Sequence, residues 1–405
     1  MDNKVHIVSK SSLSGIANSL PASKSISNRV LIINALAGGH SSLHNLSDAN
    51  DTQLMLKRIR SAETEVDVED AGTTMRFLTA YFSITNQKKL LTGTQRMKER
   101  PIGILVNALR SLGVHIGYTE KEGYPPLMIN GFSSQQASHV KIRGDVSSQF
   151  ISALMMVAPS LPSGLTLELE GKVGSRPYIE MTASLMKHFG VMSDFTNNII
   201  TIKPQRYKPA EFTVESDWSA ASYWFAFTAL ASEAKVTLPR ISLTSLQGDR
   251  AIADMSALGV AAEASNGQIT LTKKPGAGEF SWDFTHCPDL AQTVAVICAA
   301  RGIKGYFTGL ESLRIKETDR IAALQNELAK IGASLTEEGS RWVLTPSSAL
   351  PRDATFATYK DHRMAMAFAP LATRMNVTIE NPGVVKKSYP TFWDDVKGFG
   401  FSVTV

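Results

Sequence analysis

The sequence predicts an α/β fold assembled from one repeated unit. A short polar start that runs straight into an Ala-rich apolar segment occurs six times, with spacings of about 70 residues after a first spacing of about 50. Short segments between these starts alternate apolar and polar residues, as β-strands do. Most units also contain a second, more amphipathic helical segment. The predicted unit is therefore helix, strand, helix and strand pair, which is an α/β arrangement.

The six apolar segments are predicted to be buried helices, because they are apolar on nearly all sides. Their polar starts contain Ser, Thr or Asp, which cap helices. These helices are expected at residues 23–37, 70–82, 145–158, 217–231, 289–300 and 361–372. The aromatic side chains of the fourth helix, Trp218, Tyr223, Trp224 and Phe225, are expected in the core.

The remaining elements follow from the same patterns. Residues 5–16 are expected to form a strand with a turn near Gly15. Further strands are predicted at 66–68, 140–143, 165–169, 199–202, 236–238, 269–272, 341–344 and 377–379. The amphipathic helices are predicted at 101–112, 178–189, 250–258 and 319–331.

Length and composition describe an ordinary globular protein. A chain of 405 residues, with 43% hydrophobic and 20% charged residues, is sufficient for two domains. We expect one lobe from residues 1–20 and 218–405 and the other from residues 21–217, each with three repeats and the second repeat of the latter shortened around 56–70. The two cysteines exclude a disulfide framework. No signal peptide and no membrane-spanning run is apparent, so we expect a cytoplasmic protein.

The stretch from Pro21 to Arg29 is the strongest candidate binding site. It places Lys24, Arg29 and three serines at the start of a helix, where free backbone N–H groups and cations favour an anion. Similar charged stretches occur at 96–101, 172–178 and 313–320, and Ser175 is a candidate cap for the helix that follows it. Together such stretches supply Lys24, Arg29, Arg76, Arg100, Lys316, Arg320, Arg363 and Lys387.

A structural interpretation of these charges stays open. Each stretch taken alone also fits an exposed helix end with surface ion pairs of little energetic consequence. If 313–320 is helical, Lys316 and Arg320 share a face and Glu317 points away from both. The net charge of +5 suits acidic small molecules but is smaller than nucleic-acid binding usually requires.

Other chemistries are disfavoured by their missing motifs. His40 and His44 are four residues apart but have no third metal ligand nearby, and neither Cys287 nor Cys298 has a CxxC partner. Glycine spacings for a Walker A loop or a dinucleotide fold are absent. Residues 147–149 lack the glycines of a nucleophile elbow.

Six segments, spread over essentially the whole chain, carry a distinctive combination of residues: 21–29, 71–73, 96–101, 144–149, 313–320 and 361–365. They resemble the signature segments of the 5-enolpyruvylshikimate-3-phosphate (EPSP) synthase family and occur in the same order. The resemblance implies the two-domain enolpyruvyl-transferase fold. In that fold each domain has three βαβαββ repeats whose helices are buried inside sheets, an inside-out α/β barrel.

The resemblance also implies an activity, which is transfer of the enolpyruvyl group of phosphoenolpyruvate to the 5-hydroxyl of shikimate 3-phosphate. It implies Asp289 as proton acceptor, Glu317 as proton donor and Lys24 as a contact of both ligands. Residues implied for shikimate 3-phosphate are Lys24, Ser25, Arg29, Ser147, Ser148, Gln149, Ser175, Asp289, Ser312 and Lys316. Those implied for phosphoenolpyruvate are Lys24, Gly72, Arg100, Gln149, Arg320, Arg363 and Lys387. No cofactor, metal, nucleic acid or membrane is implied, and a monomer that closes on its ligands is expected.

Three positions depart from the family pattern. Asp70 stands where Asn is usual, Phe77 where Pro is common, and Ser312 where an Asn contacts the shikimate ligand. Three alternatives therefore stay open. They are a UDP-N-acetylglucosamine enolpyruvyl transferase of the same fold, an RNA-binding or RNA-processing protein of related repeat architecture, and an inactive scaffold. The first is disfavoured because the segment before Arg100 lacks the reactive Cys that many of its members carry.

Overall fold

The computed structural model describes residues 4–404, and the chain divides into two compact units. The terminal unit takes in the chain up to Ala22 and from Glu215 onward, and the middle unit runs from Ser23 to Val214. The sequence predicts the boundaries between these two units at residues 20 and 217.

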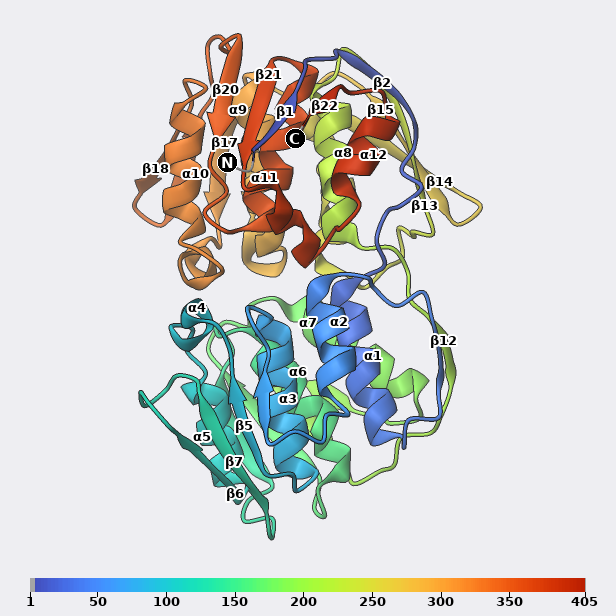
Figure 1. Cartoon of the computed structure of the whole chain (residues 1–405), viewed down its shortest axis with the longest axis vertical. Helices are drawn as coiled ribbons and strands as arrows, with labels where there is room; N and C mark the ends of the chain where they lie inside the picture. Colours follow the sequence, from blue (N-terminus) through green and yellow to red (C-terminus); the bar gives the residue numbers. More distant parts are fainter. Residues whose placement is uncertain (1–3, 405) are drawn as a thin grey trace. The chain divides into compact units, whose positions relative to one another are not determined.

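The middle unit is organised around three helices that pack against one another, α1 (Lys24–Leu36), α3 (Gly72–Ile84) and α6 (Ser148–Val157). They lie side by side in the lower part of Figure 1, with strands outside them. Each is buried along most of its length because it is apolar on nearly every side. The other helices of this unit are α2 (Asn50–Arg58), α4 (Gln95–Lys98), α5 (Gly103–Ser111) and α7 (Arg176–His188).

Three sheets enclose these helices. The first has the order β4-β5-β7-β6, with strands Glu65–Asp67, Lys89–Thr92, Leu127–Phe132 and Val114–Tyr118. The second has the order β10-β11-β9-β8, with strands Asp194–Thr196, Ile199–Ile202, Leu165–Glu170 and His139–Arg143. The third pairs β12 (Glu211–Thr213) with β3 (Ser42–His44). Each four-stranded sheet contains one parallel and two antiparallel pairs.

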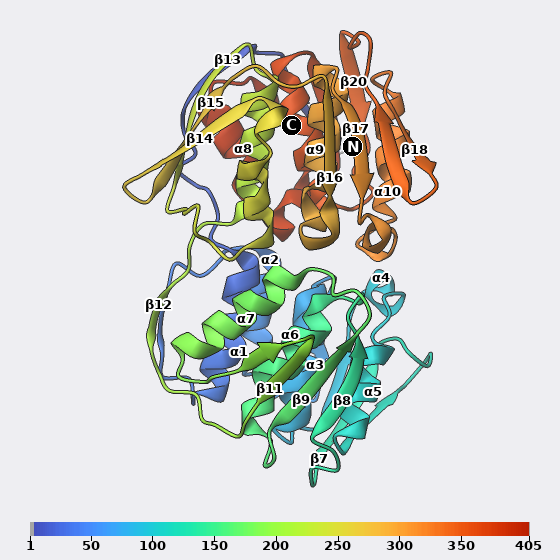
Figure 2. The ribbon, with the colours of Figure 1, turned by 180° about the vertical axis from the view of Figure 1, so that it is seen from behind.

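The terminal unit repeats the plan around α8 (Trp218–Leu230), α9 (Ala291–Arg301) and α11 (His362–Phe368), which Figure 2 shows from behind. Helices α10 (Arg320–Ala329) and α12 (Phe392–Gly398) lie outside this central group. The first sheet is β20-β21-β1-β22, with strands Asp353–Phe356, Asn376–Glu380, Lys4–Ile7 and Val403–Thr404. The second is β14-β15-β13-β2, with strands Val260–Ser265, Gln268–Lys273, Glu233–Pro239 and Ser12–Ile16. The third is β16-β17-β19-β18, with strands Glu279–Asp283, Lys304–Thr308, Arg341–Thr345 and Ser334–Glu338.

The predicted α/β repeat fold is confirmed, and all six predicted helices form. Asp217 caps α8 by accepting a hydrogen bond from the backbone N–H of Ala220 at 2.9 Å, and the four aromatic residues expected in the core are buried. The short segment 59–64 between α2 and β4 forms no strand. The sheet of β3 and β12 therefore has two strands where the other five have four, and the shortening belongs to the repeat that begins with α1.

Two predicted elements are wrong. Residues 5–16 form two strands rather than one, and β1 and β2 belong to different sheets. Gly15 is not in a turn but inside β2, where a Cβ atom would lie 3.1 Å from the ring of Phe399. Residues 250–258 form no α-helix; 3-10 turns η2 (Gly248–Asp254) and η3 (Ser256–Leu258) replace it.

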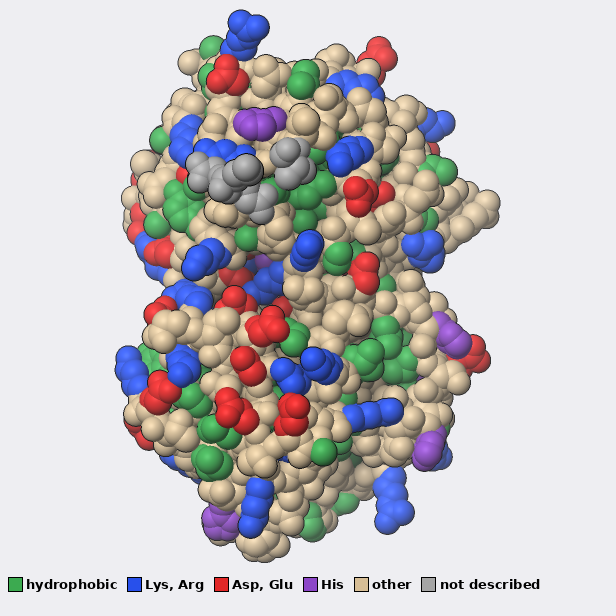
Figure 3. Space-filling view, viewed as in Figure 1, with side chains coloured by type: hydrophobic (Ala, Val, Ile, Leu, Met, Phe, Trp, Pro, Cys, Tyr) green, Lys and Arg blue, Asp and Glu red, His purple; other side chains and the backbone are tan. Residues whose placement is uncertain are grey.

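The visible surface carries both signs of charge. Figure 3 shows Lys and Arg side chains interspersed with Asp and Glu side chains on the face that it draws. In the described part of the chain no helix has the length and apolarity that crossing a bilayer requires.

Candidate active site

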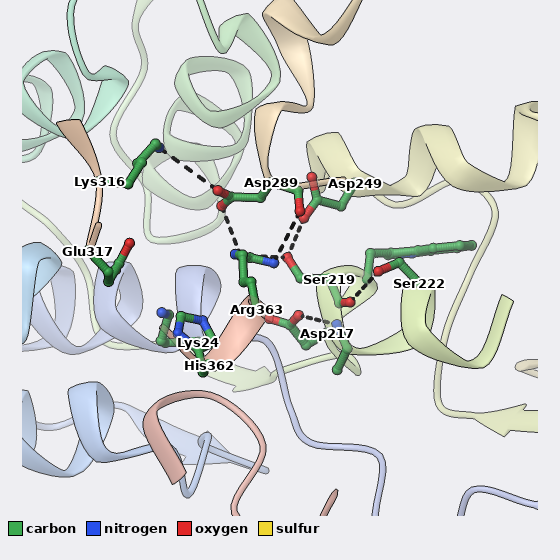
Figure 4. A network of polar contacts seen from close by, with 12 residues as sticks. Lys24, Asp217, Ser219, Ser222, Asp249, Asp289, Lys316, Glu317, His362 and Arg363 are labelled. Atoms are coloured by element: carbon green, nitrogen blue, oxygen red, sulfur yellow. Dashed lines mark hydrogen bonds and ion pairs between the residues drawn. The ribbon is translucent and has the colours of Figure 1, made fainter. Parts of the chain in front are cut away.

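The starts of the central helices of the terminal unit carry acidic and basic side chains that contact one another. Asp289 lies in the 3-10 turn η5 (Pro288–Leu290) directly before α9, and Asp361 caps α11 by accepting from the N–H of Arg363 at 2.9 Å. Segment 313–319, which precedes α10, supplies Lys316 and Glu317. Figure 4 shows several of these side chains pointing toward one another.

Arg320 lies at the centre of a cluster of charged side chains, which we call the terminal-unit charge cluster. Its members are Asp289, Lys316, Glu317, Arg320, Asp361, Arg363 and Lys387. The Arg320 guanidinium donates to Asp361 at 2.7 Å, to Asp289 at 2.8 Å and to Glu317 at 2.8 Å. The side chain is only 2% exposed. Burial alone would lower the pKa of Arg320, but the three carboxylates raise it above its ordinary value. Arg320 is therefore a permanent buried cation that fixes three carboxylates.

Asp289 is surrounded by cations. Arg363 donates to it at 2.8 Å, Arg320 also at 2.8 Å, and the Lys316 ammonium lies 3.9 Å away. Burial would raise the pKa of Asp289, but the three cations outweigh burial and hold the pKa well below its ordinary value. Asp289 is therefore ionised at neutral pH.

Glu317 has two cationic partners, Arg320 at 2.8 Å and Lys387 at 3.4 Å. Glu317 would point away from Arg320 only if segment 313–320 were helical, and this condition is not met, because residues 316–319 are not helical and α10 begins only at Arg320. The alternative of an exposed helix end with surface ion pairs is also excluded for Arg320, which is buried. Ser312 lies in the 3-10 turn η6 (Glu311–Ile315) and is half-buried.

The middle unit presents a second set of polar groups at the starts of its own central helices. Lys24 is the first residue of α1, which Ser23 caps, and its ammonium lies 3.5 Å from the carboxylate of Asp51 on α2. Gln149 donates to the hydroxyl of Thr73 at 3.0 Å and so connects the start of α6 to the start of α3. Ser147 caps α6.

Gly72 at the start of α3 lies against two guanidinium groups. A Cβ atom at this position would come within 2.6 Å of Nη1 of both Arg76 and Arg100. Arg76 also donates to the carbonyl oxygen of Gly72 at 2.9 Å. A side chain at residue 72 would therefore displace both guanidinium groups, and the N-terminus of α3 adds its own positive potential beside them.

Arg29 is buried without a carboxylate partner in the described residues. Its guanidinium donates to Thr182 at 2.7 Å, to Ser152 at 3.1 Å and to the carbonyl oxygen of Ser25 at 2.8 Å. The rings of Phe77 and Tyr178 lie 5.3 and 5.9 Å from its central carbon. Burial lowers the pKa of Arg29 to about 10, so the side chain stays charged at neutral pH.

The chain is similar to known proteins over nearly its whole length. The family model described as "EPSP synthase (3-phosphoshikimate 1-carboxyvinyltransferase)" matches residues 8–70 and 57–396. A protein named 3-phosphoshikimate 1-carboxyvinyltransferase from Bacteroides fragilis (strain YCH46) is 48% identical over 392 residues, which is 95% of each chain. The protein of the same name from Aliivibrio salmonicida is 36% identical, covering 93% of this chain and 95% of its own.

The chain belongs to the EPSP synthase family. A solved EPSP synthase from Acinetobacter baumannii has a TM-score of 0.79 over 100% of both chains at 19% identity, and it supports the fold alone. The family resemblance stated from the sequence is thereby confirmed. The comparisons do not favour the UDP-N-acetylglucosamine enolpyruvyl transferase.

The structure connects most of the residues that the family motifs singled out. In the terminal unit, ion pairs link Asp289, Lys316, Glu317, Arg320, Arg363 and Lys387. In the middle unit Lys24, Ser25 and Arg29 belong to α1. Gly72 lies so close to Arg100 that a Cβ atom at residue 72 would come within 2.6 Å of Nη1 of Arg100. Ser148 begins α6 and is buried. Ser175 precedes α7 with a φ of 51°, but its side chain makes no cap hydrogen bond, so the predicted capping role is wrong.

Several residues around these groups were not predicted to belong to the site. Asp51 pairs with Lys24, Thr73 binds Gln149, and Asp361 is the buried partner of Arg320. Asp361 and Thr73 had a sequence signal, because Asp361 occupies the cap position of a predicted helix and Thr73 lies in the family-like segment 71–73, whereas Asp51 had none. Within residues 4–404 no group of three or more His, Cys, Asp or Glu side chains is placed to hold a metal ion.

Proposed function

We propose that this chain transfers the enolpyruvyl group of phosphoenolpyruvate to the 5-hydroxyl of shikimate 3-phosphate, which gives 5-enolpyruvylshikimate 3-phosphate and phosphate. The observation that carries the proposal is the terminal-unit charge cluster, in which two carboxylates of the family's motifs, Asp289 and Glu317, are held by four cations. The identity of the two substrates is inferred from the chain's membership of the EPSP synthase family.

The reaction needs one group to take a proton and another to give one. In the proposed addition step, the 5-hydroxyl oxygen attacks C2 of phosphoenolpyruvate, its proton passes to Asp289, and Glu317 protonates C3. The tetrahedral intermediate then returns a proton from C3 to Glu317 and expels phosphate, which takes the proton held by Asp289, and the double bond is restored. Each correctly placed acid or base contributes about 10²–10⁴-fold to the rate.

The electrostatics support Asp289 in the accepting role. The carboxylate is ionised at neutral pH, as an acceptor must be, but its cationic neighbours make it a weak base. Anionic substrates that bind Arg363, Arg320 or Lys316 would compete for these cations. The pKa of Asp289 would then rise toward the value that proton transfer needs, and only when the substrates are bound.

The ligand contacts are proposed from the family motifs. For shikimate 3-phosphate we propose Lys24, Ser25, Arg29, Ser147, Ser148, Gln149, Ser175, Asp289, Ser312 and Lys316. For phosphoenolpyruvate we propose Lys24, Gly72, Arg100, Gln149, Arg320, Arg363 and Lys387. Each hydrogen bond between a cation of these sets and a phosphate or carboxylate contributes about 1.5–3 kcal/mol. We also propose that the protein acts as a cytoplasmic monomer without a cofactor.

A phosphate-release assay with both substrates tests the proposal. The wild-type protein should release phosphate only when shikimate 3-phosphate and phosphoenolpyruvate are both present, and UDP-N-acetylglucosamine should not replace the first. Asp289→Ala, Glu317→Gln and Lys24→Ala should lower kcat by about 10²–10⁴-fold while circular dichroism stays unchanged. Near-normal turnover of any one variant would remove that residue from the mechanism. Sedimentation of a dimer would contradict the monomer.

A further inference from the structure

Asp249 is a buried acid behind the terminal-unit charge cluster that the proposed mechanism does not use. It lies in η2, is 1% exposed, and its Oδ2 atom accepts a hydrogen bond from the Ser219 hydroxyl. Its Oδ1 atom has no hydrogen-bond partner in the part of the chain that the structure describes. An ionised carboxylate in such a place would lack the partners that buried charges require.

The Ser219 hydroxyl connects this acid to the cluster. Nη2 of Arg363 donates to the Ser219 oxygen at 3.2 Å and to Asp289 at 2.8 Å. Figure 4 shows the resulting series, in which Asp249, Ser219, Arg363 and Asp289 follow one another. The other terminal nitrogen of Arg363, Nη1, donates to the hydroxyl of Tyr223 at 3.4 Å and to the backbone carbonyl oxygen of Asp289 at 3.5 Å. Each end of the Arg363 guanidinium is therefore held.

The charged groups that act on Asp249 come from several segments around η2. They are Asp217, which caps α8, Asp289 of η5 and Arg363 of α11. Cys287, directly before η5, has a thiol whose pKa is raised to about 12 by burial and is thus neutral. The one acid of β14, Glu263, is exposed.

Most of these surroundings favour the protonated form of Asp249. Burial has the largest effect and raises its pKa to about 7, and the negative charges of Asp289 and Asp217 act in the same direction. Arg363 and the hydrogen bond from Ser219 oppose them. The pKa values of the two carboxyl groups on either side of Arg363 are thus driven apart, since Asp289 is ionised at neutral pH whereas a large fraction of Asp249 is protonated.

We propose that Asp249 is a positioning residue: as a neutral carboxyl group it holds the Ser219 hydroxyl against Arg363 and leaves the charge of Arg363 for an anionic ligand. This inference rests on the proposed function, because it takes phosphoenolpyruvate as that ligand. When Asp249 loses its proton, its negative charge competes with the ligand for Arg363 and repels it. Affinity for phosphoenolpyruvate should then fall as pH rises through neutrality, while the ligand contacts themselves are unchanged.

Kinetics of Asp249→Asn test the proposal, because Asn is neutral at every pH and nearly isosteric with the protonated acid. The ratio of the KM for phosphoenolpyruvate of the wild type to that of the variant cancels the titration of the substrates. This ratio should be near one at pH 6 and should reach about 5-fold or more at pH 9, with kcat less affected. An equal ratio at both pH values would overturn the proposal.

Two further variants separate positioning from general effects of a buried acid. Asp395→Asn is the matched control, since Asp395 is also buried, also has a raised pKa and also binds a hydroxyl, that of Tyr389. Its KM ratio should not change with pH. Ser219→Ala removes the connecting oxygen and should raise the KM for phosphoenolpyruvate by about 2- to 12-fold at both pH values. An unchanged KM would show that Ser219 does not orient Arg363.

A spectroscopic measurement keeps the inference testable if the proposed function fails. The infrared band of a protonated buried carboxyl group should be present in the wild-type protein at pH 6, should disappear by pH 9, and should be missing from Asp249→Asn. A wild-type spectrum without this band at pH 6 would overturn the protonation of Asp249 whatever the substrates are. Absence of phosphate release with the band present would instead contradict the proposed function alone.

Discussion

The guanidinium of Arg320 donates to the carboxylate of Asp361 at 2.7 Å, and the side chains are only 2% and 0% exposed. A buried ion pair of this kind is costly to desolvate, but removing one partner is costlier, because the other charge is then left alone in the interior. Arg320 also donates hydrogen bonds to Asp289 and Glu317, so the stability of the fold and the proposed chemistry both depend on this one side chain.

Arg320→Ala should therefore destabilise the protein as well as inactivate it. We expect the free energy of unfolding to fall by about 3–5 kcal/mol, because Asp361 becomes an unpaired buried charge. Urea denaturation followed by circular dichroism measures this loss. Arg314→Ala is the control, since Arg314 likewise has acidic partners, Asp319 at 3.7 Å and Glu337 at 3.2 Å, but is 47% exposed. Its effect should stay within about 1 kcal/mol, and equal effects of the two variants would contradict the assigned role of Arg320.

The lowered pKa of Asp289 predicts a pH-dependent contribution to stability. A carboxylate whose folded pKa is below its unfolded value, which is about 3.9, stabilises the folded state above that value. This stabilisation is lost as the pH falls through the folded pKa. Asp289→Asn should thus be less stable than the wild type at pH 5 to 7, and the difference should shrink below about pH 4.

Urea denaturation of both proteins at a series of pH values tests this prediction. Asp254→Asn is a suitable control, because Asp254 pairs with Arg250 at 2.9 Å but is 51% exposed. Its difference from the wild type should be small at every pH. A difference for Asp289→Asn that grows as the pH falls would mean that the cations do not hold the pKa of Asp289 down.

Gly72→Ala should weaken binding of phosphoenolpyruvate selectively. The added Cβ would come within 2.6 Å of Nη1 of both Arg76 and Arg100, so these flexible side-chain ends must move away. Loss of one charge-assisted hydrogen bond costs about 1.5–3 kcal/mol, which corresponds to a rise in KM of about 10- to 150-fold. Gly117→Ala is the control in the same unit, because no atom lies within 4 Å of its Cβ position. Similar KM values for the two variants would argue against Gly72 and Arg100 as phosphoenolpyruvate contacts.

The helix starts could be predicted because their information is local. Ser23, Asp217 and Asp361 are caps that precede apolar segments, and each makes the expected cap hydrogen bond. The predicted helix at 250–258 failed because its i to i+3 hydrogen bonds are those of 3-10 turns. The side chain of Asp249, bound to Ser219 on α8, holds the first turn there, and such a tertiary contact overrides helix propensity.

The site residues could also be predicted only where their signal is local in the sequence. Lys24 and Lys316 could be found because they lie in recognisable motifs, and Asp289 because it begins a predicted helix, whereas their ionic partners come from distant segments of the chain. Gly15 illustrates the limit for glycines, since it suggested a turn but is required by the Phe399 ring that packs on it, 384 residues further along the chain. Contacts over such separations have no local sequence signal.

The hydroxyl of Thr182 holds the Nε end of the Arg29 guanidinium. Thr182 accepts from Nε of Arg29 at 2.7 Å and contacts Ser152 at 2.9 Å, and all three side chains are buried. Thr182→Val keeps the shape but leaves the Nε donor without its acceptor, which should cost about 1–3 kcal/mol of stability in urea denaturation. If Arg29 binds shikimate 3-phosphate as proposed, the KM for that substrate should rise while the KM for phosphoenolpyruvate stays constant.

Thr85→Val provides the matched control, because the Thr85 hydroxyl donates to the carbonyl oxygen four residues earlier, as that of Thr182 does, but is exposed. Its effects on stability and on both KM values should be small. If Thr182→Val raises both KM values equally, the hydroxyl supports the middle unit as a whole and does not orient Arg29 toward one substrate. If the variant is as stable as the wild type, the buried Nε has found another acceptor, and the proposed hydrogen-bond network around Arg29 is wrong.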